Sequence, residues 1–344
     1  MSFKPTGKAL PAGKLPSGLL TALLDGIPGS GPGVVVGARY GEDAAVIDVG
    51  GRYLVLAMDP VTLSAEPGRI AVQINANDVA VMGAEPRWLL ASLLLPSGST
   101  EIDVQRVMDQ LRVGCLSLGV SLIGGHTEIS PSVTHPVVAA CMIGEVPPDR
   151  LITSGGVMIG DQVLLAGAIA VEGTGILARE YADALRSRGV SEEWIREGAA
   201  LLDDPGISVL PAIRALMTAA VPHSMHDPTE GGIVSSLREL VATPQAGVRV
   251  DVERIPVLAC CRAICDALQL DPLSLLASGS LLVALAPADL APVRKALTAA
   301  GIVSAAIATI VPGTEGMTMV RDGVEEPLPE VERDELARWV DAAG

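Results

Sequence analysis

The chain has 344 residues, a formal net charge of −16 and 49% hydrophobic residues, of which few are aromatic. This length accommodates two domains, and the composition is that of a globular protein rather than a disordered one. The acidic balance and the 2% aromatic content argue against the basic surfaces and stacking platforms of nucleic-acid-binding proteins. We therefore expect no nucleic-acid partner.

The cysteine pattern and the hydropathy indicate in which cellular compartment the protein is expected. Five cysteines form neither paired C-x-x-C motifs nor a regular framework, which is typical of reducing surroundings. Cys261 and Cys265 are expected to share one face of a helix in a buried, structural role. No apolar stretch reaches membrane-spanning length, and the first residues lack a signal-type apolar core. We predict a cytoplasmic protein without a membrane partner.

Residues 1–33 are predicted to be a flexible N-terminal segment. The stretch Gly26–Gly33 is too rich in glycine and proline for a regular element. A glycine-rich loop can cradle phosphate, but this one lacks the Lys and Ser/Thr of a P-loop and follows no strand. A linker is therefore favoured over a phosphate loop.

An acidic motif, Gly41-Glu42-Asp43, precedes the first long apolar strand, predicted at Ala44–Val49. A short strand is expected before it at Val34–Val36. Glu42 and Asp43 are held at the mouth of the buried strand, although Asp43 taken alone fits a turn residue equally well. The motif places two carboxylates at a fixed point of the fold.

The next strand, Arg52–Met58, is joined to the preceding one by a hairpin turn at Gly50-Gly51. It is predicted to end at Asp59-Pro60, because proline cannot donate to a strand ladder. Asp59 would then be a second strand-end carboxylate that faces a cleft or solvent.

A helix is predicted from Pro67 to Gly83, apolar on nearly all sides and therefore buried. Asn75, Asn77 and Asp78 lie in its middle, where polar groups are costly unless they are paired. One satisfied polar residue in a buried helix is common, but this cluster favours a ligand or a metal ion.

A glycine pair and a histidine follow the strand predicted at Val120–Ile123, in the order Gly124-Gly125-His126-Thr127-Glu128. Glycines at a strand end allow an anion to approach the backbone, while His126 is either a site residue or structural. The neighbouring elements are predicted at Trp88–Leu95 (strand), Glu101–Leu118 (helix) and Val137–Gly144 (strand). Alternating strands and helices indicate an α/β domain over residues 34–150.

The second half, residues 151–344, opens with a strand at Gln162–Ala166. The loop Glu172–Gly175 is predicted to precede a helix at Ile176–Arg188, where free N–H groups would meet an anion. Further strands are expected at Val248–Val252, Leu281–Leu285, Ala305–Ile310 and Met317–Arg321, and further helices at Val257–Leu268, Leu290–Ala300 and Glu332–Trp339.

The strongest motif of this half is His226-Asp227-Pro228-Thr229-Glu230-Gly231-Gly232. One interpretation is a helix start, with Asp227 as N-cap, Pro228 at the first position and Glu230 at the third. The two glycines contradict it, since each costs about 1 kcal/mol in a helix interior. They indicate that something approaches the backbone closely there.

With these motifs assembled, the chain resembles the aminoimidazole ribonucleotide (AIR) synthetase, or PurM-like, superfamily over nearly its whole length, closest to HypE-like and AIR-synthase-related proteins. The resemblance rests on five motifs in the family's order: Gly41–Val46, Asp59, Asn77-Asp78 with Met82–Pro86, Gly124–Glu128 and Asp227–Gly232. It implies a two-domain α/β (α+β) fold. The N-terminal ATP-binding domain would form a dimer sheet or barrel with a second copy, and ATP would lie between the domains.

The resemblance also implies cofactors, ATP and Mg²⁺, and roles for individual residues. The implied metal ligands are Asp43, Asp59, Asp78 and Asp227. The implied nucleotide contacts are Gly41, Glu42, Asp43, Asn77, Gly124, Gly125 and Thr127, and the implied catalytic residues are His126, Asp227 and Glu230. Magnesium held on carboxylates suits a chain with only four lysines and no P-loop.

Departures from the family pattern decide which functions we expect. HypE carries a carbamoyl group on a C-terminal cysteine, whereas this sequence ends Asp341-Ala342-Ala343-Gly344, and His226 and Glu230 stand where HypE has arginines. We expect a HypE-like enzyme, without that tail chemistry, that phosphorylates or activates a small-molecule or amide-type acceptor as a homodimer. The alternatives are a non-catalytic ATP-binding maturation or regulatory protein and a small-molecule kinase resembling thiamine-monophosphate kinase.

Overall fold

The computed structural model describes residues 10, 13–25, 27–62, 64–242 and 245–343. The chain divides into two compact units. The N-terminal unit comprises Gly31–Gly37 and Asp43–Leu151. The C-terminal unit begins at Ile152 and also takes in Ala38–Glu42 and the described residues up to Ser30. The chain therefore passes between the units within the acidic motif, between Glu42 and Asp43.

The N-terminal unit contains a six-stranded open sheet with the strand order β1-β2-β3-β6-β4-β5. Neighbouring strands are antiparallel, apart from the parallel pair β4 and β5. The strands are β1 (Val34–Val36), β2 (Ala45–Asp48), β3 (Tyr53–Val61), β4 (Glu85–Pro96), β5 (Ser121–Ser130) and β6 (Val137–Val146).

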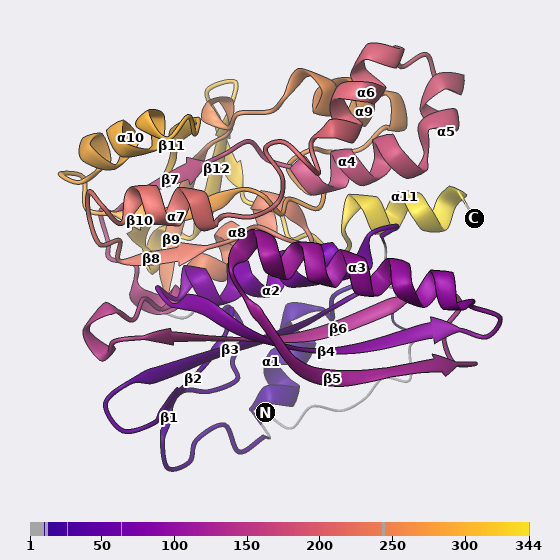
Figure 1. Ribbon diagram of the computed structural model, residues 1–344. Coiled ribbons are helices and arrows are strands. Elements are labelled where there is room, and N and C mark those ends of the chain that lie inside the picture. The colour runs from indigo at the N-terminus through magenta and orange to yellow at the C-terminus, as the bar shows by residue number, and fades with distance from the viewer. Residues whose placement is uncertain (1–9, 11–12, 26, 63, 243–244, 344) are drawn as a thin grey trace. The chain divides into compact units, whose positions relative to one another are not determined.

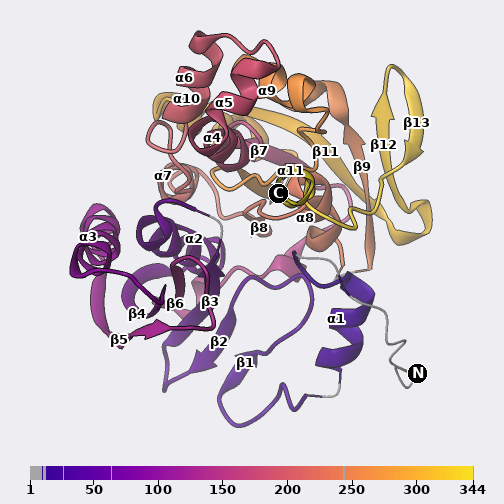
Figure 2. The same cartoon turned by 90° about the vertical axis from the view of Figure 1, so that its right-hand side faces the viewer.

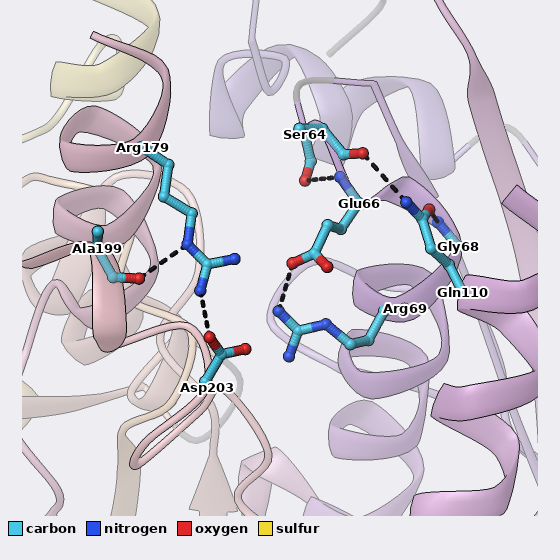
Figure 3. Close-up of polar contacts among 9 residues, drawn as sticks. Ser64, Glu66, Gly68, Arg69, Gln110, Arg179, Ala199 and Asp203 are labelled. Carbon is cyan, nitrogen blue, oxygen red and sulfur yellow. Dashed lines mark hydrogen bonds and ion pairs between the residues drawn. The ribbon is translucent and has the colours of Figure 1, made fainter. Parts of the chain in front are cut away.

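Helices α2 (Pro67–Val81) and α3 (Glu101–Leu118) lie side by side over one face of this sheet (Figure 1). The helices approach closely because α2 carries Gly68, where a Cβ atom would lie 2.6 Å from the carbonyl oxygen of Val107. Gln110 of α3 accepts the Gly68 N–H at 3.2 Å, and Glu66 and Arg69 form an ion pair at 2.6 Å beside it (Figure 3). The buried helix predicted from Pro67 is thus confirmed, with its end at Val81.

The opposite face of the six-stranded sheet is the more exposed one. Along β4 and β6, alternate residues are buried on the helix side, while their neighbours on the other side remain partly exposed. Apolar side chains on exposed positions include Met58 and Leu90, and β5 is exposed along nearly its whole length. Within the N-terminal unit, both helices pack on one side, so the second face carries apolar surface without a helix over it.

Two predicted strand ends are wrong. β3 runs past Asp59 to Val61, and Pro60 pairs with Ala139 of β6. Proline is tolerated there because β2 pairs with β3 only from Tyr53 to Leu56, which leaves the other side of β3 without a ladder at Pro60. Likewise β5 does not end at Ile123 but continues through the glycine pair to Ser130, since it pairs with β4 along this length.

The C-terminal unit contains a seven-stranded sheet with the order β13-β12-β9-β11-β7-β10-β8, in which β12 and β9 are parallel and the other pairs antiparallel. Figure 2 shows the hairpin of β12 and β13 at one edge. The strands are β7 (Gln162–Ala166), β8 (Ser224–His226), β9 (Ala246–Asp251), β10 (Leu281–Leu285), β11 (Ser304–Pro312), β12 (Met317–Arg321) and β13 (Val324–Pro327).

The helices of this unit pack around its sheet. One group consists of α4, α6 and α9, which contact one another, and α7 and α10 form another pair. In the first group Arg179 binds the carbonyl of Ala199 and the carboxylate of Asp203 (Figure 3). The helices are α1 (Ser17–Leu24), α4 (Val171–Glu180), α5 (Ala182–Ser187), α6 (Glu192–Ala200), α7 (Leu210–Leu216), α8 (Gly232–Leu240), α9 (Ala259–Leu268), α10 (Leu290–Ala299) and α11 (Glu335–Ala343).

Several predictions for this unit need comment. Helix α1 is a regular element inside segment 1–33, which is predicted to be flexible, but it ends before Gly26–Gly33, the stretch for which no regular element is predicted. The predicted loop Glu172–Gly175 is the buried beginning of α4, and Gly175 is needed because a Cβ atom there would lie 2.5 Å from Leu202. These glycines therefore serve helix packing rather than a free helix terminus. The predicted helix at Ile176–Arg188 is also divided, because α4 ends at Glu180.

The cysteines have the predicted structural surroundings. Cys261 and Cys265 are buried on one face of α9, with their sulfur atoms 3.9 Å apart, and all five cysteines are free thiols. In the part of the chain that the structure describes, none of the helices combines the length and the apolar character that crossing a membrane requires.

Candidate functional site

The loop between β8 and α8 carries the strongest sequence motif. α8 begins at Gly232 rather than at Pro228, so the interpretation of Asp227 as a helix cap, which the two glycines contradict, is wrong. Gly231 and Gly232 have φ angles of 80° and 63°, in the left-handed region that favours glycine. A Cβ atom at Gly232 would lie 2.4 Å from the carbonyl oxygen of Leu273. The predicted close backbone approach is therefore confirmed, and the approaching group is the protein's own backbone.

A buried contact between a histidine and a carboxylate lies under this loop. His226, at the end of β8, places Nε2 3.0 Å from Oε2 of Glu239 in α8, and both side chains are at most one-tenth exposed. Burial by itself would raise the pKa of Glu239, but Lys14 and His226 outweigh it and lower that pKa. Glu239 is therefore held in its charged form between His226 and Lys14.

Lys14 of the N-terminal segment contacts the same loop. Its backbone N–H donates to Oε2 of Glu230 at 2.9 Å, and its ammonium group donates to the Thr229 hydroxyl at 3.1 Å. The ammonium nitrogen also lies 4.0 Å from Oε1 of Glu239. Sequence reasoning missed both Lys14 and Glu239. The signal for Lys14 was its rarity, since the chain has only four lysines.

The first half of the acidic motif lies against Glu239 as well. Gly41 has a φ of 85°, and a Cβ atom there would lie 2.9 Å from the Glu239 carbonyl oxygen. Burial and the charge of Glu239 raise the pKa of Tyr40 to about 12. The carboxylate of Glu42 pairs with Arg39 at 2.6 Å and accepts the N–H of Ser154 at 3.4 Å. The structure thus brings two distant motifs together inside the C-terminal unit.

Two buried carboxyl groups flank the loop on another side. Asp334 accepts the N–H of Gly231 at 2.7 Å, and burial raises its pKa to about 6. Glu172 of α4 is fully buried, which raises its pKa to about 7, and the charges of Asp334 and Glu230 act in the same direction. Carboxyl groups that titrate near neutrality can exchange protons at physiological pH.

The N-terminal unit holds the remaining predicted acids. Asn75 is buried in α2, and its side-chain amide clamps the backbone of Asp59 in β3, accepting the Asp59 N–H at 2.8 Å and donating to the Asp59 carbonyl at 3.1 Å. Asn75 is thus a structural residue that fixes Asp59 relative to α2. Asn77 and Asp78 lie buried on the same helix, and Asp43 is half-buried ahead of β2.

Unlike Asn77 and Asp78, the motif around His126 is exposed. His126 lies within the exposed edge strand β5, with its side chain 66% exposed, and contacts Glu128 at 3.2 Å. Gly125 has a packing requirement, because a Cβ atom there would lie 1.8 Å from the Ala91 carbonyl oxygen of β4. Gly125 is therefore explained by strand packing, and the nucleotide contacts predicted for Gly124, Gly125 and Thr127 remain predictions.

The predicted magnesium ligands are divided between the units: Asp43, Asp59 and Asp78 belong to the N-terminal unit and Asp227 to the C-terminal unit. Among the described residues, no group of three or more His, Cys, Asp or Glu side chains is gathered as a metal site would need. The chemistry of the donors does suit Mg²⁺, which takes one or two carboxylates and completes its shell with waters and substrate phosphates.

A cavity in the N-terminal unit contains none of the predicted site residues. It has a volume of about 690 Å³ and lies between the beginning of α2 and the outer face of α3. Charged side chains on its wall include Glu66, Arg69 and Arg106.

Known sequences and structures resemble the chain over most of its length. The profile of the AIR synthase related protein, N-terminal domain, matches residues 41–146, and that of the C-terminal domain matches residues 159–320. The carbamoyl dehydratase HypE of Cupriavidus necator is 30% identical over 263 residues, 73% of this chain and 71% of the relative. A putative hydrogenase expression/formation protein of Methanocaldococcus jannaschii is 28% identical and matches over 74% of each chain.

Solved structures share the fold. The crystal structure of E. coli HypE superposes with a TM-score of 0.74 at 22% identity, covering 94% of this chain and 99% of that one. A HypE structure in complex with ATP has a TM-score of 0.69 at 24% identity and covers 86% and 90% of the two chains. The predicted two-domain α/β, PurM-like fold is therefore confirmed, although the six-stranded sheet of the single chain is open rather than a closed barrel.

Proposed function

Because the chain belongs to the AIR synthase-related protein family, we propose that it is an ATP- and Mg²⁺-dependent, HypE-like enzyme that phosphorylates or activates a small-molecule or amide-type acceptor. The relative in Cupriavidus necator is a carbamoyl dehydratase, and one HypE structure of the same fold contains ATP. A thiamine-monophosphate kinase-type structure of the same fold holds AMPPCP, with a TM-score of 0.66 at 18% identity over 85% of this chain and 91% of that one.

The observation that carries this proposal is the placement of Asp59 and Asp78 on two elements that are locked together. The Asn75 amide fixes the Asp59 backbone to α2, and Asp78 follows Asn75 by three residues on that helix. Side chains at this spacing lie on one helix face. Asp43 comes from the same unit. Two or three carboxylates from one unit, on backbone that is fixed in this way, suit an Mg²⁺ ion that shares its ligand shell with ATP phosphates.

In the proposed enzyme, Asp43, Asp59, Asp78 and Asp227 would hold Mg²⁺, which would neutralise phosphate charge during transfer. Gly41, Glu42, Asn77, Gly124, Gly125 and Thr127 would contact the nucleotide, and His126, Asp227 and Glu230 would serve the acceptor step. Glu42 is already engaged with Arg39 and Ser154, so its contribution would be to shape the backbone of the motif.

Calorimetry with Mg·ATP tests the proposal. We expect binding by the native chain and, for Asp43→Asn and Asp78→Asn, affinity weaker by at least about tenfold because a charged metal ligand becomes neutral. Asp149→Asn, at an exposed position of the same unit, is the matched control and should bind like the native chain. Absence of Mg·ATP binding, or unchanged affinity in both variants, contradicts the proposal.

A second candidate is a non-catalytic, ATP-binding maturation or regulatory protein. It is favoured by the internal engagement of two motif side chains, His226 with Glu239 and Glu230 with the Lys14 amide. ATP binding without hydrolysis over a panel of small acceptors would support it. Transfer of phosphate to thiamine monophosphate would instead support a small-molecule kinase.

The same proposal includes a homodimer formed through the N-terminal unit. Among the described strands, only β4 pairs with β5, which lies at the edge of the six-stranded sheet, and apolar side chains such as Leu90 and Ile129 lie exposed nearby. Edges and uncovered apolar faces of this kind are usually paired in the functional assembly. A molar mass of about 70 kDa by light scattering, twice the 35.2 kDa of the chain, is the expected result.

A further inference from the structure

The loop Asp227–Gly232 carries no positive charge of its own. Its residues are Asp, Pro, Thr, Glu, Gly and Gly, and His226 before it is paired with Glu239. A loop of this composition repels phosphate groups unless a cation is brought to it from elsewhere. In the proposed function, Mg²⁺ on Asp227 supplies positive charge at the start of the loop, and a protein cation beside Thr229 and Glu230 would add to it.

Lys14 brings a cation to the loop from more than two hundred residues away. The segment is held at two points, because Glu230 accepts the Lys14 N–H and Ser17 donates to Oε1 of Glu330 at 3.3 Å. The ammonium group then reaches the Thr229 hydroxyl at 3.1 Å. The carboxylate at position 230 therefore orients the lysine through its backbone and leaves the ammonium group directed to Thr229.

The ammonium group forms a salt bridge with Glu239 but, unlike a buried counter-ion, remains accessible to solvent. Its side chain is 52% exposed, whereas that of Glu239 is 10% exposed, and 4.0 Å separates the nitrogen from the nearest Glu239 oxygen. Glu239 makes its closer contact with His226, at 3.0 Å. The ammonium group thus lies at the solvent side of the loop, where a small anionic ligand can reach it.

We propose that Lys14 is a phosphate-binding, specificity-determining residue at this loop. Its ammonium group supplies the positive charge that Asp227–Gly232 lacks and contacts a phosphate group of the nucleotide or of the acceptor. This inference rests on the proposed function. The contact is a charge-assisted hydrogen bond, which is about twice as strong as a neutral one.

Lysine labelling tests the contact directly. Reductive methylation followed by mass spectrometry resolves each of the few lysines, and exposed Lys295 of α10 is the internal control. With Mg·ATP at a concentration that calorimetry shows to be saturating, we expect several-fold slower modification of Lys14 and no change at Lys295. Adenosine should not protect Lys14. Protection by inorganic phosphate alone would support the contact and assign it to an acceptor or product phosphate.

Variants provide a second test. Lys14→Met should weaken binding of Mg·ATP by about tenfold, the loss expected for one hydrogen bond to a charged group. Lys14→Arg should retain most of the affinity, and Lys295→Met should bind like the native chain. The double variant Lys14→Met with Glu230→Arg, which places a cation on the loop itself, should recover part of the loss.

The outcomes separate the two proposals. If the native chain does not bind Mg·ATP, the proposed function fails and this inference fails with it. If it binds, but Lys14 is modified at the same rate with Mg·ATP and with inorganic phosphate as without them, only the inference is overturned. Native affinity in Lys14→Met, even with a lower melting temperature, would likewise show a purely structural lysine. Should that variant not fold, the labelling result decides.

Discussion

Two glycine pairs that look alike in the sequence have different structural roles. Gly124-Gly125 lies inside the edge strand β5, where Gly125 is required by the approach of Ala91 in β4. Gly231-Gly232 lies between β8 and α8, with both residues in the left-handed region. The first pair belongs to an exposed sheet edge, and the second to a loop surrounded by charged partners. A shared motif type therefore does not indicate a shared function.

The largest expected loss of stability is at Gly125, and it should distinguish Gly125 from Gly124. Gly125→Ala places a methyl group 1.8 Å from the Ala91 carbonyl oxygen and should destabilise the protein by more than about 4 kcal/mol, through overpacking and backbone strain together. Gly124→Ala is the control, because its nearest neighbour is the flexible Leu90 side chain at 3.3 Å. Denaturant unfolding measures both. Equal stability of the two variants would contradict the packing explanation.

A smaller effect is expected at the second pair. Gly232→Ala meets the Leu273 carbonyl oxygen at 2.4 Å at a positive φ and should cost about 3 kcal/mol. Gly231→Ala meets the Ser235 hydroxyl at 2.1 Å, which can rotate away, and the Ser235 Cβ at 2.9 Å, which must shift slightly. It should cost about 2 kcal/mol, from this shift and from its positive φ. Urea midpoints of the two proteins measure the difference. A Gly231 variant that is the less stable of the two would show that the backbone of Leu273 does not limit the loop.

A third effect is a pH dependence of stability that belongs to the loop region. The pKa of Glu172 is raised from 4.5 to about 7 in the fold, so its contribution to stability is fully present below pH 4.5 and is lost as the pH rises through about 7. Between about pH 4.5 and pH 6.5, the native protein should lose roughly 2 kcal/mol of unfolding free energy through Glu172, and Glu172→Gln should not show this loss. Chemical unfolding at several pH values measures it, and parallel curves for the two proteins would contradict it.

The sequence alone predicted much of the fold. The apolar periodicity predicted α3 with the bounds Glu101–Leu118 and β7 with the bounds Gln162–Ala166, both as the structure has them. It also predicted the buried helix that begins at Pro67, because local patterns determine such elements. The family followed from five motifs in order, and the matching profiles confirm it.

The sequence could not assign a task to each motif residue. As a polar residue in a buried helix, Asn75 is predicted to belong to a ligand or metal site. Its partner is instead the Asp59 backbone, which only the packing of α2 on β3 brings within reach. Pro60 was predicted to end its strand. The strand continues because β2 is too short to pair there, a fact of sheet topology that no local signal contains.

Composition and local patterns thus determined the class, the family and the acidic motifs of this protein, since these depend on residues close together in the chain. Only the tertiary structure brought Lys14, Gly41 and Glu239 together around the Asp227–Gly232 loop. Contacts between residues so far apart in the chain depend on how whole elements pack, and sequence periodicity carries no information about such pairings. The positive charge at the loop was therefore visible in the sequence only as one rare lysine, and its place was decided by the fold.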